Sequence, residues 1–223
     1  MALAAPGLPV SSFNTVVGLR QGQAHLVEPL ALWSRAHGAK GRFEIAAGDD
    51  EPALGRALAR IGFFQSEFHA ALIGRADRPP EQGDDISVTR IKTAADMEDF
   101  LDAYVAGWSI PTEAQEQFKF NVRPWLEQSG WSLYLAREDG RPAGAAILFV
   151  HEGVGYFADA AVDPAFRGRG LHKALLSRRW RDARGAGVDF VCSGAAFLSA
   201  SHRNMEASGM RLLFLKAIWT PLE

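Results

Sequence analysis

The sequence predicts an α/β fold built from two successive parts. Predicted strands and helices alternate along most of the 223 residues. A polar stretch at residues 77–85, with a Pro pair and a glycine, separates two regions of apolar patterning. Each region also ends in a helix, a glycine and an apolar strand, as at Gly62-Phe63 and Gly209-Met210. Because this length suits one large domain or two small ones, we place a domain boundary in the polar stretch.

The part before the boundary, residues 1–78, reads as a smaller α/β domain. β-Branched residues favour a strand at 13–19. Pro29 in the first turn and Gly38 past the end delimit a helix at 28–37. Asp50 is a suitable cap for a short helix that Gly62 ends. Further strands are predicted at 43–47 and 63–73.

The part after the boundary, residues 86–223, contains more elements. A hairpin across Asp139-Gly140 joins predicted strands at 131–137 and 141–150. The second of these is apolar on both faces, as a central strand would be. The other predicted elements are strands at 86–92, 155–162, 188–192 and 210–219, and helices at 94–107, 112–123, 170–184 and 199–207.

Composition excludes several classes of protein. A net charge of −2 gives no basic face for nucleic acid. The single cysteine, Cys192, excludes a disulfide framework or a Cys-rich zinc site, and the six histidines show no metal-ligand spacing. The start is a poor signal peptide, and the longest uncharged apolar run, residues 143–150, is too short to span a bilayer. We expect a cytoplasmic protein without metal, membrane or nucleic-acid partners.

The most informative segment is the turn after the strand at 155–162. Pro164 ends the strand because it has no N–H to donate. Gly168 and Gly170 let the backbone pass close to a bulky anion. The amides that open the following helix lack intrahelical acceptors, so together with the helix dipole they favour a phosphate. Arg167 and Arg169 add positive charge. The turn lacks the Walker-loop ending and the third glycine of a dinucleotide fingerprint.

This turn resembles the coenzyme motif of the GNAT superfamily of acetyl-CoA-dependent N-acetyltransferases. Arg167-Gly-Arg-Gly170 matches the first four positions of the motif, and Val162-Asp-Pro164 supplies its lead-in. His172 stands at the sixth position, where the family has a small residue. Residues 201–210 resemble the later family helix, and the order of elements fits over all of 86–223. The resemblance implies a mixed, mostly antiparallel central sheet flanked by helices.

The resemblance also implies which residues bind acetyl-CoA, the acyl donor. The end of the strand, at Ala160, Ala161 and Val162, would hold pantetheine. Asn204 is a candidate to hydrogen-bond the pantetheine amide, with a capping or surface role as the alternative. The pyrophosphate would lie on the turn, at Arg167, Gly168, Arg169, Gly170, Leu171 and His172.

In this family an amine attacks the thioester directly, which requires a base. Asp159 is our first candidate, although it could also face solvent or pair with an arginine; Glu152 and His151 are weaker candidates. The tyrosine that often serves as the acid is replaced by Met205. Ser201 is our candidate instead, with His202 or a water as alternatives. We interpret Cys192 as a core residue rather than a nucleophile.

The matching element order raises the possibility of an internal repeat, in which residues 1–78 are a degenerate half GNAT fold. Coincidence remains open, because α/β chains often look alike. We expect no coenzyme in this half. Its aromatic residues and histidines could line an acceptor pocket or fill a core: Trp33, His37, Phe63, Phe64, Phe68 and His69. In the second half, Trp108 is a candidate for the acceptor site.

The sequence therefore predicts transfer of acetyl to a primary amine of a small molecule or amino acid. Two alternatives remain: a non-catalytic acyl-CoA sensor and a protein N-acetyltransferase. The oligomeric state is open, a homodimer included.

Overall fold

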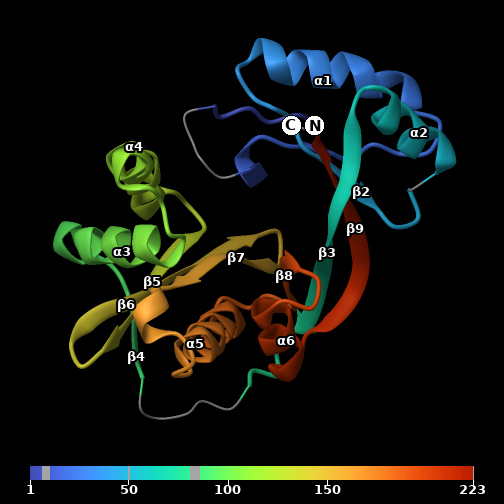
Figure 1. Cartoon of the computed structure of the whole chain (residues 1–223). Coiled ribbons are helices and arrows are strands. Elements are labelled where there is room, and N and C mark those ends of the chain that lie inside the picture. The colour runs from blue at the N-terminus through green and yellow to red at the C-terminus, as the bar shows by residue number, and fades with distance from the viewer. Residues whose placement is uncertain (7–10, 50, 81–85, 223) are drawn as a thin grey trace. The chain divides into compact units, whose positions relative to one another are not determined.

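The structure is a computed structural model that describes residues 1–6, 11–49, 51–80 and 86–222. Over these ranges nine strands form one mixed sheet in the order β1-β2-β9-β3-β8-β7-β6-β5-β4, accompanied by six α-helices (Figure 1). The pairs β2–β9, β4–β5, β5–β6 and β6–β7 are antiparallel, whereas β1–β2 and β7–β8 are parallel. The predicted mixed sheet with flanking helices is confirmed.

The chain divides into two compact units. Unit 1 contains Met1–Ala71, Ala195–Phe197 and Leu213–Glu223, and unit 2 contains Leu72–Gly194 and Leu198–Leu212. Strands β3 (Phe63–Arg75) and β9 (Arg211–Pro221) each have residues in both units. A separate N-terminal domain is therefore not shown, and the limits 1–78 and 86–223 stay predictions. Residues 81–85 of the predicted linker lie outside the described part of the chain.

Unit 1 packs two helices around a small apolar core. Its remaining elements are β1 (Val16–Val17), α1 (Val27–Ala36), β2 (Phe43–Ala46) and α2 (Pro52–Arg60). Phe43 and Phe63 meet edge to face at 5.2 Å between ring centroids in this core. The strand predicted at 13–19 is wrong in extent, since a 3-10 turn occupies Ser11–Phe13 and Gly18 has a φ of 81°. Asp50, the predicted cap of α2, lies outside the described ranges.

Unit 2 is a three-layer arrangement. Helices α3 (Ala94–Gly107) and α4 (Thr112–Val122) lie on one side of the strands, and α5 (Leu171–Gly185) lies on the other (Figure 1). Helix α6 (Ala200–Ala207) contacts α5. The strands of this unit are β4 (Ser87–Arg90), β5 (Trp131–Glu138), β6 (Arg141–His151), β7 (Val154–Val162) and most of β8 (Phe190–Ala196).

The predicted hairpin and central strand are confirmed. Asp139 and Gly140 have φ values of 49° and 76°, as a two-residue type I′ turn requires. Strand β6 pairs with β5 on one edge and β7 on the other, and Ala145 and Ile147 are fully buried. Apolar side chains on both faces of β6 are thus explained by helices covering both sides of it.

Two irregularities in β7 shape the site that follows. Ile147 of β6 stands opposite both Ala158 and Asp159, because the register shifts between Ala146 and Leu148. Such a bulge re-aims side chains: Phe157 packs on Trp180 of α5, whereas Asp159 bonds to α3. The parallel pairing with β8 ends at Phe157↔Ser193, while β7 continues to Val162. The edge of β7 beyond Phe157 is therefore free of this ladder.

Candidate active site

The turn between β7 and α5 has the backbone geometry that an anion site needs. Asp163 accepts from the Ala165 N–H at 2.9 Å and begins a 3-10 turn over Pro164–Phe166. Gly168 and Gly170 then have φ values of 79° and 90°, a region that side-chain-bearing residues rarely adopt. These two glycines direct the backbone into the start of α5.

The first amides of α5 are available to a ligand. The first intrahelical bond runs from the Ala174 N–H to the Gly170 carbonyl at 3.0 Å. Among the residues that the structure describes, no side chain caps this end and no acidic residue lies in the first turn. The N–H groups of Leu171, His172 and Lys173 precede that bond, so they retain the partial positive charge of a helix N-terminus.

The two arginines of the turn hold its shape. Arg167 donates from Nε to the Val162 carbonyl and from Nη2 to the Gly107 carbonyl, both at 3.1 Å. Arg169 donates to Glu138 at 3.1 Å and to the Ala165 carbonyl at 3.3 Å. Both cations therefore stand at the turn, with two nitrogens of each engaged with protein acceptors.

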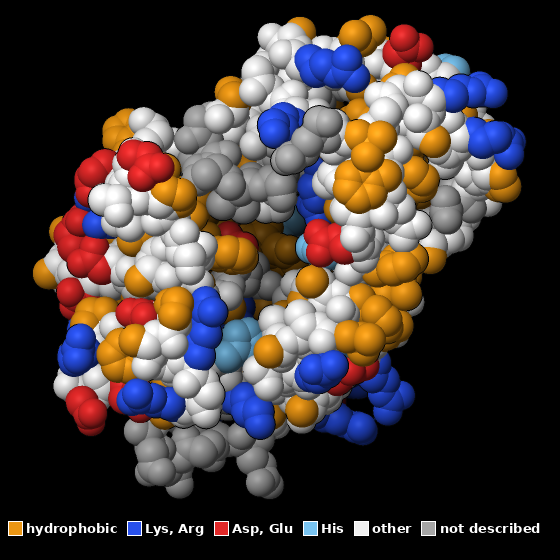
Figure 2. Space-filling view, in the orientation of Figure 1, with side chains coloured by type: hydrophobic (Ala, Val, Ile, Leu, Met, Phe, Trp, Pro, Cys, Tyr) orange, Lys and Arg blue, Asp and Glu red, His pale blue; other side chains and the backbone are white. Residues whose placement is uncertain are grey.

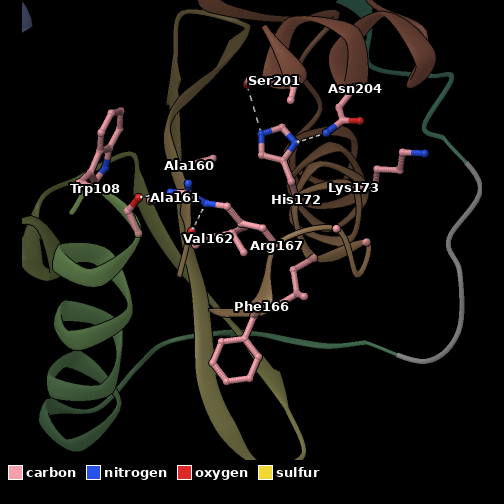
Figure 3. Close-up of a pocket in the computed structure, with 15 residues that line it drawn as sticks. Trp108, Ala160, Ala161, Val162, Phe166, Arg167, His172, Lys173, Ser201 and Asn204 are labelled. Carbon is pink, nitrogen blue, oxygen red and sulfur yellow. Dashed lines mark hydrogen bonds between the residues drawn. The ribbon is translucent and has the colours of Figure 1, made fainter. Parts of the chain in front are cut away.

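A pocket of about 570 Å³ opens beside this turn (Figure 3). That size is within the range typical of ligand sites. Every predicted coenzyme residue except Arg169 lines it. The full lining is Gly107, Trp108, Ala160, Ala161, Val162, Phe166, Arg167, Gly168, Gly170, Leu171, His172, Lys173, Ala200, Ser201 and Asn204. The end of β7, the turn and α6 thus converge on one cavity, and these residues fit a ligand with a pyrophosphate.

His172 lies within this lining and connects α5 to α6. Its Nε2 is 3.2 Å from Ser201 Oγ and its Nδ1 is 3.3 Å from Asn204 Nδ2 (Figure 3). Burial, together with the charge of Arg179, lowers the pKa of His172 to about 4. The ring is therefore neutral near pH 7.

Asp159 is held by a buried tyrosine rather than by an arginine. Tyr104 of α3 donates to Asp159 Oδ2 at 2.6 Å. Burial raises the pKa of Asp159, while the Tyr104 hydrogen bond and the charge of Arg179 oppose that rise. Burial and the Asp159 carboxylate raise the pKa of Tyr104 well above its usual value. Asp159 is not in the pocket lining but keeps part of its surface exposed.

Arg179 is a buried cation beneath the bulge of β7. Its Nη1 donates to the carbonyls of Ile147 at 3.1 Å and Ala158 at 3.0 Å. The guanidinium also lies 4.8 Å from the centre of the Phe157 ring. Burial lowers the pKa of Arg179 to about 10. This side chain satisfies the two carbonyls that the bulge displaces from the ladder.

The weaker catalytic candidates lie outside the pocket lining. His151 and Glu152 are exposed at the hairpin before β7, at the other end of that strand from the pocket. Cys192 is half-buried, and burial raises the pKa of its thiol, as expected for a packing residue. His202 is buried and accepts from the Leu198 N–H at 3.2 Å. Met205 is also buried.

The aromatic and histidine candidates of unit 1 have different environments. Phe63 belongs to the core, whereas Phe64 and Phe68 are exposed. Trp33 is partly exposed and its ring lies 4.2 Å from that of His37. Burial lowers the pKa of His69.

Three site features escaped sequence reasoning. Tyr104 carried no signal, because a tyrosine in an apolar helix looks like any core aromatic. Gly107 ends α3 and approaches Ala161 so closely that a Cβ there would lie 2.6 Å from the Ala161 Cβ. Arg179 was also missed, although the sequence contains a signal for it: a charged residue between Leu176 and Trp180 on the apolar face of α5.

Within the described ranges, no group of three or more His, Cys, Asp or Glu side chains could hold a metal ion. No helix in those ranges has the length and apolar character needed to cross a membrane.

The pocket lies at a strand–turn–helix junction with free helix amides, an arrangement that suits a ligand carrying phosphate. Residues 69–197 match the family described as Acetyltransferase (GNAT) domain, which covers more than half of the chain. The chain therefore belongs to the GNAT acetyltransferase family.

Solved structures share this fold at low identity. A functionally unknown conserved protein from Staphylococcus epidermidis ATCC 12228 matches with a TM-score of 0.75 and 13% identity, covering 98% of this chain and 89% of that one. A GCN5-related N-acetyltransferase from Sphaerobacter thermophilus matches with a TM-score of 0.69 and 19% identity, covering 89% and 68%. A third, from Kribbella flavida, has a TM-score of 0.67 and 16% identity, covering 93% and 78%. No curated protein matches.

Proposed function

We propose that this protein transfers an acetyl group from acetyl-CoA to a primary amine of a small molecule or amino acid, by direct attack of the amine on the thioester. The observation that carries the proposal is the pocket itself. It combines the free edge of β7, the uncapped amides of α5 and polar side chains of α6. Pantetheine would lie along Ala160–Val162, and pyrophosphate on the turn at 167–172.

Asp159 is the base in this proposal. Tyr104 occupies Oδ2, so Oδ1 is the oxygen that receives the amine proton. A raised pKa brings a carboxyl group closer to the operating pH, where a general base is most effective.

Ser201 assists the departing sulfur. It lines the pocket, whereas Met205, which replaces the usual tyrosine, is buried outside the lining. A serine hydroxyl is far less acidic than a thiol, whose pKa is about 8.5. Ser201 therefore donates a hydrogen bond to the thiolate rather than a proton.

A small acceptor is favoured over a protein acceptor. A protein N-acetyltransferase predicts an open groove lined with carboxylates. Acidic side chains do gather over α3 and α4 (Figure 2), but several are held in ion pairs. These pairs are Asp102–Lys119, Glu98–Arg123 and Asp99–Arg137. Within the proposal, unit 1 binds no coenzyme.

The coenzyme site is tested by calorimetric titration with acetyl-CoA and desulfo-CoA. Gly170→Glu places a negative side chain in the turn, and we expect affinity to fall by about 100-fold or more. Gly187→Glu is the control, because this glycine beyond the other end of α5 also has a positive φ, 74°. An added Cβ meets nothing within 4 Å at Gly187 and only the Ile86 Cδ1 atom, at 3.3 Å, at Gly170. Equal binding by both variants and the wild type would contradict the proposed site.

Turnover is tested next, by following CoA thiol release from acetyl-CoA with a panel of primary amines and amino acids. An amine-dependent rate supports the acetyltransferase. Tight binding without turnover of any amine would instead support the acyl-CoA sensor. The reason for considering a sensor is that Met205 replaces the tyrosine that often serves as the acid in this family.

A further inference from the structure

His172 departs from the family motif, and both of its ring nitrogens have partners. Ser201 and Asn204 are three residues apart, so they lie on the same face of α6. Ser201 Oγ is 3.2 Å from Nε2 and Asn204 Nδ2 is 3.3 Å from Nδ1. Both ring nitrogens of His172 thus contact side chains on one face of α6 (Figure 3).

This arrangement selects one tautomer of the ring. An amide NH₂ can only donate, so Nδ1 of His172 must accept from Asn204. A neutral imidazole has a single N–H, which then belongs to Nε2. That N–H donates to Ser201 Oγ.

The tautomer in turn orients the serine hydroxyl. A hydroxyl group has one proton and two acceptor lone pairs. Since Nε2–H of His172 occupies a lone pair of Ser201 Oγ, the hydroxyl proton cannot point at the ring. Ser201 lines the pocket, so its proton is free to be directed into the cavity.

On the basis of the proposed function, we propose that His172 is a positioning residue that holds the Ser201 hydroxyl proton toward the sulfur of the acyl donor. As the C–S bond breaks, its electron pair stays on sulfur, and the thiolate accepts a hydrogen bond from Ser201. The amine proton goes to Asp159, and Ser201 keeps its own proton. In this proposal His172 contacts neither the thioester of the acyl donor nor the amine of the acceptor substrate.

The opposite tautomer would give Ser201 a different role. If Asn204 presented its oxygen, Nδ1 would carry the proton and Nε2 would accept from Ser201. This is the arrangement of a serine nucleophile with its base. It predicts an acetyl-serine enzyme, visible by mass spectrometry as an acetyl adduct on the peptide that contains Ser201.

The tautomer is measured directly by ¹⁵N NMR of histidine-labelled protein at pH 7. We expect a protonated Nε2 and a bare Nδ1 for His172, assigned by comparison with His172→Gln. Asn204→Asp should reverse the two nitrogens, because a carboxylate only accepts. A protonated Nδ1 in the wild type, or an acetyl-serine adduct, would overturn the proposal whatever the enzyme's activity.

Kinetics then test the role, using the amine that the panel selects. Ser201→Ala and His172→Ala should each lower kcat by roughly 10- to 100-fold, the range for one hydrogen bond to a charged group. The double variant should be no worse than either single one, because the two act as a unit. The affinity for acetyl-CoA should change less than about twofold in calorimetry.

Two further variants separate positioning from packing. His172→Gln places an amide N–H where Nε2–H stands and should restore most of kcat. Ser208→Ala removes a hydroxyl just beyond the other end of α6, outside the pocket lining, and should leave kcat unchanged.

The outcomes distinguish the two proposals. If the wild type turns over an amine but His172→Ala is equally fast, only the role of His172 is refuted. The same holds if the kcat losses of Ser201→Ala and His172→Ala add up in the double variant. A folded wild type without turnover of any amine refutes the proposed function and this role with it.

Discussion

Gly107→Ala is expected to disturb both the stability of unit 2 and the proposed coenzyme pocket. Gly107 is the last residue of α3, and its carbonyl accepts from Arg167 in the turn. An added Cβ would lie 2.6 Å from Ala161 Cβ, 2.9 Å from Ala161 C and 2.9 Å from Val162 N. Carbon atoms in contact prefer about 3.5–4.0 Å. Helix and strand must therefore separate by roughly 1 Å.

The magnitude follows from two opposing effects. Overpacking costs about 1–3 kcal/mol, and the upper end applies because two of the three atoms are backbone. Alanine in place of glycine in a helix recovers at most about 1 kcal/mol. The expected loss is about 2 kcal/mol in the free energy of unfolding, measured by urea titration. Calorimetry should also show weaker acetyl-CoA binding, because the displaced strand end lines the pocket.

Gly185→Ala provides the matched control. Gly185 is the last residue of α5, and an added Cβ there meets no atom within 4 Å. This variant should be neutral or more stable by up to about 1 kcal/mol. Adding Ala161→Gly to Gly107→Ala removes the Cβ–Cβ contact but leaves both backbone contacts, so it should recover only part of the loss. If Gly107→Ala were as stable as Gly185→Ala and bound acetyl-CoA normally, the close approach of α3 to β7 would be refuted.

Four further predictions concern buried ionisable groups. Asp159→Asn should lower kcat by about 10²–10⁴-fold without changing acetyl-CoA affinity, and an unaffected kcat would exclude it as the base. Tyr104→Phe removes a hydrogen bond that favours the Asp159 carboxylate, so the pKa of Asp159 should rise and the acid limb of the pH–rate profile should move to higher pH. The pKa of His172 is about 4 in the folded protein, against an ordinary 6.5, so the unfolded chain binds the proton first as the pH falls. Folding stability is therefore lost as the pH falls from about 6.5 towards 4. Between pH 7 and pH 5 the free energy of unfolding of the wild type should fall by about 2 kcal/mol more than that of His172→Gln, measured by urea titration. Arg179→Met should destabilise the fold by about 3 kcal/mol or more, since two bulge carbonyls lose their donor; a smaller change in urea titrations would mean that water replaces it.

The local elements and the backbone geometry of the turn between β7 and α5 followed from the sequence. Glycine positions, the Pro164 break and the periodicity of apolar residues are short-range signals, and they placed α3, α5, α6 and the β5–β6 hairpin within one or two residues. The conformation of the turn could be predicted for the same reason. It depends only on neighbouring residues, namely the positive φ values at Gly168 and Gly170 and the free amides of α5.

Contacts between distant residues were decided only by the tertiary structure. Asp159 reaches Tyr104 because a bulge opposite Ile147 turns it to the α3 side, and no local pattern in β7 encodes that register shift. The partners of His172 come from a helix 29 and 32 residues away. Strands β3 and β9 join residues of both units into one sheet, although the polar stretch suggested two separate domains. Sequence spacing fixes what lies within a turn or a helix, whereas packing between elements fixes the hydrogen-bond partners and charge states of Asp159 and His172.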